Sequence, residues 1–155
     1  DGADRLFFVR NGVEKTLAGG PDNAAPPVHP DHEERGTREI PVGDAVVIEP
    51  DDVPADGERI WLKGYGPVRH VDGRFEFTDE SIEIVREGNV DVVHWVPKDR
   101  GVPLRLRTMD GDETGHAEPG VSEYAADEIV QFERIGFARI DRHDSKESVA
   151  YFAHP

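Results

Sequence analysis

The sequence predicts an all-β protein, and three observations support that prediction. Short apolar runs bounded by Gly, Pro, Asn or Asp recur along the chain, giving about eleven strands at spacings of about 8 to 15 residues. Several runs alternate between apolar and polar residues; within 102–109, Leu104 and Leu106 would face inward and Arg105 and Arg107 outward. No long helical period is present. The pattern is typical of β-barrels and sandwiches.

The expected elements follow from these runs and the turns between them. Asn11-Gly12 predicts a turn, and Asp72-Gly73 predicts a tight hairpin between two strands. Residues 110–122 are acidic and contain glycine, so we expect a long loop there. Residues 124–133 are the one candidate for a helical turn, and no internal repeat is evident. The expected strands cover residues 5–10, 45–49, 58–63, 68–71, 74–78, 81–86, 90–97, 102–109, 129–135, 137–140 and 148–152.

Length and composition restrict the class of protein. The chain has 155 residues, enough for one domain or two small ones that share a core. Cysteine is absent, which excludes disulfides and thiolate metal sites and fits a cytosolic protein. No apolar run reaches the roughly 18 residues that span a bilayer. Met109 is the only methionine, so we expect the chain to be a piece of a longer protein.

The charge predicts adaptation to high salt. Acidic residues number 33 against 18 basic ones, for a net charge of −15. Above 1 M salt the Debye length is about 3 Å, so crowded surface carboxylates no longer repel one another. We expect a halophilic archaeal source. Because nucleic-acid binders usually carry a basic patch, an RNA-binding face would have to gather its Arg and Lys locally.

Residues 128–141 carry the most specific chemistry. Gln131 and Arg134 are too long and polar for a core, and they interrupt an apolar run. A planar amide and a planar guanidinium suit the hydrogen-bonding edges of bases. From these residues alone, a solvated face on an edge strand is the alternative interpretation.

The segment Gln131-Phe132-Glu133-Arg134, followed by Gly136-Phe137 and Arg139-Ile140-Asp141, resembles the last part of the anticodon-binding domain of glutamyl- and glutaminyl-tRNA synthetases. The segments that carry the resemblance occur in family order over nearly the whole chain, and the last of them is similar to the archaeal glutamyl type. They are Arg5-Leu6-Phe7-Phe8-Val9, Val28-His29-Pro30, Arg35-Gly36-Thr37-Arg38, Val93-His94-Trp95-Val96-Pro97, Gln131-Phe132-Glu133-Arg134, Gly136-Phe137, Arg139-Ile140-Asp141 and Tyr151-Phe152-Ala153-His154.

The resemblance implies a topology that strand spacing cannot show. It implies two six-stranded barrels of the glutaminyl-tRNA synthetase anticodon-binding type. Residues 1–59 and 123–155 would form a barrel proximal to the catalytic body, and residues 60–122 a distal one. A catalytic domain with the nucleotide-binding signatures of a class I synthetase would precede Asp1.

The resemblance also implies site residues. Arg5, Gln131 and Arg134 match positions at which the family reads anticodon bases, especially the central uridine. Lys63, Tyr65, Arg69 and His70 lie where the family's second barrel approaches the loop, although Trp61 and the break at 64–67 depart from the bacterial glutaminyl pattern. Arg105 and Arg107 balance an acidic face. For Arg35 and Arg38 we expect pairing with neighbouring glutamates, with phosphate contact as the alternative; these residues are Glu33, Glu34 and Glu39.

Catalytic signatures are missing from the chain. Neither GxxxxGK[ST] nor GxGxxG occurs. We therefore expect no catalytic residues and no cofactor in this piece, with ATP and magnesium used by the intact enzyme. His29 and His32, with His70 or His94 added, offer an alternative metal site of the cupin kind. No zinc spacing matches, so we expect no metal.

These observations lead to one functional hypothesis and two alternatives. The chain is expected to bind the anticodon loop of glutamate tRNA as part of a monomeric, cytoplasmic glutamate–tRNA ligase, joined to its own N-terminal catalytic domain and without membrane contact. Whether glutamine tRNA is also charged stays open. The alternatives are a metal-dependent β-barrel enzyme using His29 and His32, and a non-catalytic acidic module that binds a protein.

Overall fold

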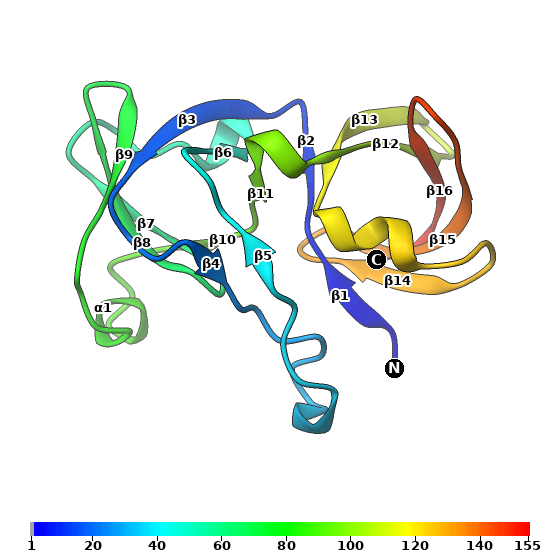
Figure 1. Ribbon diagram of the computed structural model, residues 1–155, viewed down its shortest axis with the longest axis horizontal. Coiled ribbons are helices and arrows are strands. Elements are labelled where there is room, and N and C mark those ends of the chain that lie inside the picture. Colours follow the sequence, from blue (N-terminus) through cyan, green and yellow to red (C-terminus); the bar gives the residue numbers. More distant parts are fainter. Residues whose placement is uncertain (1) are drawn as a thin grey trace.

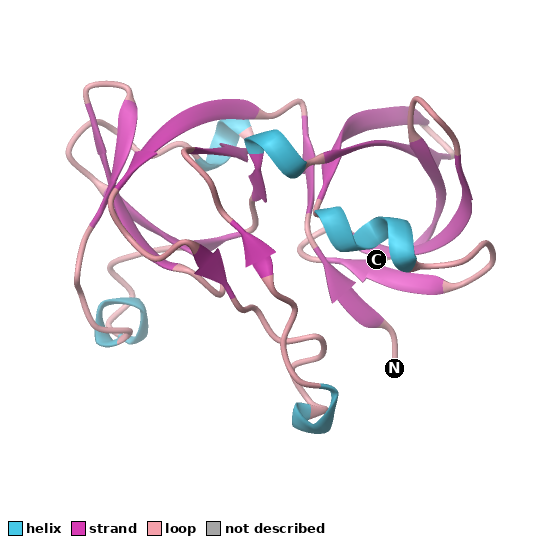
Figure 2. Ribbon diagram, viewed as in Figure 1, coloured by secondary structure: helices cyan, strands magenta, loops and turns pink. Residues whose placement is uncertain are grey.

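The computed structural model describes residues 2–155 and confirms the all-β prediction. Two curled sheets lie side by side, and strands dominate both (Figures 1 and 2). Within residues 2–155 no helix is long and apolar enough to cross a membrane. The helical segments are short: α1 (Glu83–Arg86) and 3₁₀ turns at Glu33–Arg35, Pro50–Asp52, Lys98–Arg100 and Pro119–Glu123.

Each sheet contains seven strands, and a separate two-stranded ribbon pairs β4 (Asn23–Ala24) with β5 (Ile40–Pro41). We call the two sheets the first and second barrels. The first barrel runs in the spatial order β1 (Asp4–Leu6), β14 (Ile129–Phe132), β15 (Gly136–His143), β16 (Ser148–His154), β12 (Val102–Thr108), β13 (Gly111–Ala117), β2 (Phe8–Arg10). The second runs β10 (Val92–Val93), β7 (Arg59–Leu62), β8 (Gly66–Val71), β9 (Arg74–Phe77), β3 (Val13–Ala18), β6 (Ala45–Ile48), β11 (Val96–Pro97).

The two edge strands of each sheet lie close together because they follow each other directly in the chain. Strands β1 and β2, at opposite ends of the first sheet, are separated only by Phe7. Strands β10 and β11 occupy the same places in the second sheet, with His94 and Trp95 between them. Each sheet therefore curls until its first and last strands come together, which removes the open edges that a flat sheet would leave.

The continuous apolar run at residues 6–9 is explained by its position between the barrels. Leu6 and Phe8 belong to the core of the first barrel. Phe7 and Val9 belong to the core of the second. Since successive side chains of an extended chain point to opposite sides, a segment buried on both sides must be apolar throughout.

The strand pairing divides the chain differently from the expected boundaries. Strands β3 and β6, from the segment 1–59, lie in the second barrel, and β12 and β13, from 60–122, lie in the first. The reason is that the chain crosses between barrels twice, after β2 and after β11. Residue 1 of the expected proximal barrel lies outside the described residues.

The two barrels are built from one repeated pattern. If β1, β2, β3, β6, β7, β8 and β9 are matched in order with β10 to β16, the two spatial orders become identical. The hairpins agree in detail: Ile60 faces Val68 and Val130 faces Ala138, each 70 positions later. The first two strands of each repeat lie in the barrel of the other. The repeat is not evident in the sequence, because matched residues such as Ile60 and Val130 are both buried but differ in type.

Other elements were predicted correctly, missed or wrong. The hairpin around Asp72-Gly73 is confirmed as β8–β9, with both turn residues at positive φ. A strand over 81–86 is wrong: this segment turns as α1, with no buried residue to hold it in a sheet. A loop over 110–122 is also wrong, because it contains β13. Strand β3 was missed, and residues 90–97, expected as one strand, form β10 and β11 at the two edges of the second barrel.

Candidate nucleic-acid interface

Arg5 and Gln131 lie side by side on the outer face of the first barrel. Strands β1 and β14 are parallel, and Arg5 is the register partner of Gln131. Their neighbours Leu6, Val130 and Phe132 are buried inside, so the two polar side chains point away from the core. The Gln131 Oε1 atom is buried and has no hydrogen-bond partner within residues 2–155.

The same row continues across the sheet with two rings. Phe137 on β15 is the register partner of Gln131, and His154 on β16 is the partner of Phe137. The Phe137 and His154 ring centroids are 4.6 Å apart with an interplanar angle of 32°. The row thus places a guanidinium, an amide and a π surface in sequence. Hydrogen-bonding groups beside aromatic faces are what unpaired bases bind.

Arg134 lies at the end of the same hairpin, in the turn between β14 and β15. Its φ of 66° is in the left-handed region, which costs a non-glycine residue about 1–2 kcal/mol. The matching turn of the second barrel has Gly64, with φ of 75°. The first barrel therefore keeps a strained arginine where its repeat has an unstrained glycine, an observation that points to a role for the side chain.

The Arg134 guanidinium is held by the second barrel. Its Nη1 donates to Asp52 Oδ2 at 2.7 Å and its Nη2 to Asp52 Oδ1 at 2.9 Å. Nη1 also lies 3.1 Å from His94 Nδ1. This bidentate pairing raises the pKa of Arg134 above its ordinary value, although burial opposes the shift.

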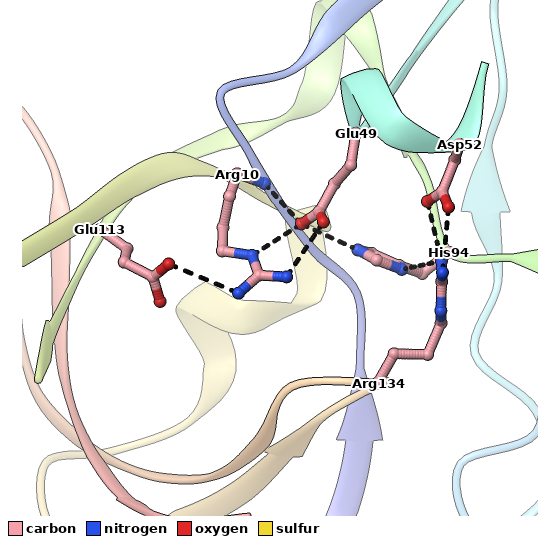
Figure 3. Close-up of polar contacts among 6 residues, drawn as sticks. All are labelled: Arg10, Glu49, Asp52, His94, Glu113 and Arg134. Atoms are coloured by element: carbon pink, nitrogen blue, oxygen red, sulfur yellow. Dashed lines mark hydrogen bonds and ion pairs between the residues drawn. The ribbon is translucent and has the colours of Figure 1, made fainter.

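These contacts belong to a larger group of polar side chains between the barrels, drawn in Figure 3. His94 Nε2 lies 3.3 Å from Glu49 Oε2. Glu49 accepts from Arg10 Nε, Nη2 and backbone N–H at 2.9, 3.0 and 3.0 Å, and Arg10 Nη1 reaches Glu113. We call the group the junction cluster; it comprises Arg10, Glu49, Asp52, His94, Glu113 and Arg134.

Hydrogen-bonding chemistry fixes the tautomer of His94 in this cluster. A guanidinium only donates, so His94 Nδ1 must accept from Arg134. The neutral ring then carries its proton on Nε2, which faces Glu49. Burial would raise the pKa of Glu49, but the hydrogen bonds from His94 and Arg10 outweigh it and hold that pKa well below its ordinary value. Glu49 is therefore an anion that accepts hydrogen bonds from Arg10 and lies beside the His94 ring.

Of the residues expected on the second barrel, only Lys63 reaches the first. Lys63 Nζ donates to Glu133 Oε1 at 3.0 Å, next to Arg134 in the turn. The Tyr65 hydroxyl donates to the Pro21 carbonyl at 2.9 Å, and burial, followed by the charge of Asp22, raises the pKa of Tyr65 to about 12. Arg69 donates to the Gly57 carbonyl. Tyr65 and Arg69 are thus engaged within their own barrel.

The other sequence candidates make structural contacts. Arg35 and Arg38 do form ion pairs, but with Asp4 and Glu118 rather than with the adjacent glutamates. Arg105 pairs with Asp112 and Glu147.

The metal alternative receives no support from the histidines. The His29 and His32 rings lie 4.5 Å apart, and His29 Nδ1 accepts from the Asp31 backbone N–H at 3.1 Å. His70 Nδ1 is 2.7 Å from the Pro54 carbonyl, and His94 lies in the junction cluster. Across the part of the chain that the structure describes, no group of three or more His, Asp or Glu side chains could hold a metal ion.

Asp52, Glu49 and the role of His94 were missed in the sequence. Asp52 stands in Pro50-Asp51-Asp52, which indicates only the end of a strand. The sequence offers His94 as an additional ligand of the alternative metal site, and nothing in its neighbourhood in the sequence connects it with Arg134. These residues come close to Arg134 only in the folded protein, where the turn at Pro50–Asp52 contacts the turn between β14 and β15.

Two family models match the chain. Both describe the anticodon-binding domain of class I tRNA synthetases for E and Q, over residues 3–91 and 92–141. The chain belongs to this family. The border between the two matches falls where the second copy of the strand pattern begins, just before β10.

The similar proteins found by sequence comparison are glutamate–tRNA ligases, as the glutamyl type predicts. The chain is 76% identical over 155 residues to a glutamate–tRNA ligase of Natronomonas pharaonis, covering 100% of the chain and 27% of the relative. The Haloarcula marismortui enzyme of the same name is 58% identical over 164 residues (100% and 28%), and that of Methanosarcina barkeri 38% over 158 residues (98% and 27%). The chain thus spans about a quarter of their length. Similarity to halophilic relatives supports the salt adaptation expected from the charge.

Proposed function

We propose that the chain binds the anticodon loop of glutamate tRNA and that it is the anticodon-binding part of a glutamate–tRNA ligase. The observation that carries the proposal is the alignment of Arg5 and Gln131 on adjacent strands, with Arg134 at the end of the same hairpin. Splayed bases of a single-stranded loop are recognised by such groups on their exposed edges.

Under this proposal the chain binds tRNA and does not itself carry out the aminoacylation reaction. A catalytic domain outside this chain would join glutamate to the tRNA with ATP and magnesium. The barrels would fix the anticodon end and thereby orient the acceptor end. The acidic surface need not prevent this, because molar salt screens its carboxylates, while Lys63 and Arg134 lie at the contact between the barrels and Arg5 lies beside Gln131 on the first barrel.

The proposal is tested with an anticodon stem-loop RNA of glutamate tRNA and versions with one anticodon base replaced. Binding of the 155-residue chain is measured in molar KCl. Gln131→Ala and Arg134→Ala should each lower discrimination against a replaced central base by about 5- to 150-fold, since a base contact contributes about 1–3 kcal/mol.

The matched control is Arg139→Ala. Arg139 lies on the same hairpin but pairs with the exposed Asp127 at 2.9 Å, so its removal should leave discrimination unchanged. If both Gln131→Ala and Arg134→Ala retain full discrimination, the assignment of the site is incorrect. Equal binding of stem-loops of glutamate and glutamine tRNA is the result expected if the anticodon-binding part serves both tRNAs.

A further inference from the structure

The donors of Arg134 can be counted from its contacts. A guanidinium has five N–H groups. Asp52 takes one from Nη1 and one from Nη2, and His94 takes the second of Nη1. The two that remain are Nε–H and the second N–H of Nη2. They lie parallel on one edge of the planar group, and within residues 2–155 no hydrogen bond to Nε is found. We call them the free edge of Arg134.

The partners that hold Arg134 are themselves fixed and less exposed than it is. The Asp52 side chain is 10% exposed and that of His94 1%, against 47% for Arg134. The other ring nitrogen of His94, Nε2, lies 3.3 Å from Oε2 of Glu49, and Glu49 accepts hydrogen bonds from Arg10. The charged and titratable groups packed around His94 are thus Glu49, Arg134 and, beyond them, Arg10 and Asp52 (Figure 3). The guanidinium is anchored on its inner side and open on its outer side.

We propose that Asp52 and His94 are positioning residues that aim the free edge of Arg134 at an unpaired base. The inference rests on the proposed function. Two parallel donors can converge on one carbonyl oxygen of a base edge, such as O4 of the central uridine, or meet two adjacent acceptors, such as O2 and N3 of cytosine. Because both positioning residues come from the second barrel, base discrimination by the first barrel depends on the docking of the two.

The experiment is a double-mutant cycle on the ratio of affinities for cognate and base-replaced stem-loops. Asp52→Asn places an amide NH₂ against the guanidinium and should lower this ratio about tenfold. In the Arg134→Ala background the same substitution should have no further effect, because Asp52 acts through Arg134. Asp52→Glu, which keeps both acceptor oxygens, should recover part of the ratio.

Asp127→Asn is the matched control, since Asp127 holds Arg139 on the same hairpin, and it should leave the ratio intact. Thermal unfolding of each variant reports whether the fold is retained. If Asp52→Asn preserves the ratio while Arg134→Ala loses it, the positioning role is overturned and the proposed function stands. If Arg134→Ala itself preserves the ratio, base reading by Arg134 fails. An equal loss of affinity for all RNAs would overturn base reading in favour of a phosphate contact.

Discussion

Two glutamates, one in each barrel, bind the backbone of the segment that lies between the barrels. Glu49 and Glu118 occupy matching places, each directly before a 3₁₀ turn. Each accepts two N–H groups of one arginine and one backbone N–H from residues 7–10. The two repeats thus use these positions in the same way. Glu49, after β6, and Glu118, after β13, each hold the segment 7–10 that lies between the barrels, although the arginines come from different parts of the chain.

Glu118 should be among the side chains most important for stability. It is 1% exposed, accepts from Arg38 Nε and Nη2 at 2.9 Å each, and accepts from the Phe7 N–H at 2.6 Å. Burial raises the pKa of Glu118, with a smaller contribution from the charge of Glu133, while Arg38 and the Phe7 N–H oppose the rise; the three N–H donors around the carboxylate favour its ionised form. Glu118→Ala should lower the free energy of unfolding by about 3–5 kcal/mol, because Arg38 is left buried without its partner.

Urea unfolding at constant KCl measures this effect. Glu83→Ala is the control, because Glu83 pairs with Arg86 in the open, with side-chain exposures of 60% and 68%. It should change the free energy of unfolding by no more than about 0.5 kcal/mol. Equal effects of the two substitutions would contradict the role of Glu118.

Without the family resemblance, which supplied Arg5, site residues could be predicted from the sequence only where the chain brings them together locally. Gln131 and Arg134 share one hairpin, so their common position was accessible. Asp52 reaches Arg134 across 82 positions, and no local pattern marks an aspartate in a surface turn as a partner. The expected pairing of Arg38 with Glu39 or Glu33 failed for the same reason, since a buried partner far along the chain was available.

Elements were predictable where burial alternated and unpredictable where it did not. Strand β12 has a clear inward face at Leu104 and Leu106, and its alternation was confirmed. Strand β13 was missed because its residues are mostly polar and exposed; it is a strand because β12 and β2 supply hydrogen-bond partners on both sides. Ile82 and Ile84 have the spacing of an alternating strand, yet Ile82 is exposed and Ile84 lies in α1, which buries none of its residues.

Gly115 is a position in β13 at which an added side chain should disturb the pairing with β2. It faces Arg10 across β13 and β2, and a Cβ built on it would lie 1.9 Å from the Val9 carbonyl oxygen. Gly115→Ala should push β2 away from β13 and lower the free energy of unfolding by about 3 kcal/mol. Gly120→Ala is the control, because the nearest atom to its added Cβ is 3.7 Å away. A similar midpoint for both variants in urea would argue against a tight crossing.

The whole molecule combines a strongly acidic composition with a proposed site for a polyanion. The net charge is −15, and the cations of the junction are engaged by carboxylates: Arg10 by Glu49, Lys63 by Glu133 and Arg134 by Asp52. At low salt the protein and the RNA phosphates therefore repel each other over about 10 Å, whereas at 1 M salt this range falls to about 3 Å. Short-range hydrogen bonds to bases survive that screening.

Salt should consequently act on this domain in the opposite direction from most nucleic-acid binders. Affinity for the glutamate anticodon stem-loop should rise between about 0.1 M and 1 M KCl, whereas proteins that bind through phosphate contacts lose affinity over such a range. Filter binding or fluorescence anisotropy across KCl concentrations measures it. Circular dichroism at each concentration separates a binding effect from loss of the fold. A steady fall in affinity with a folded chain throughout would mean that phosphate contacts, and not base edges on a screened acidic surface, dominate the complex.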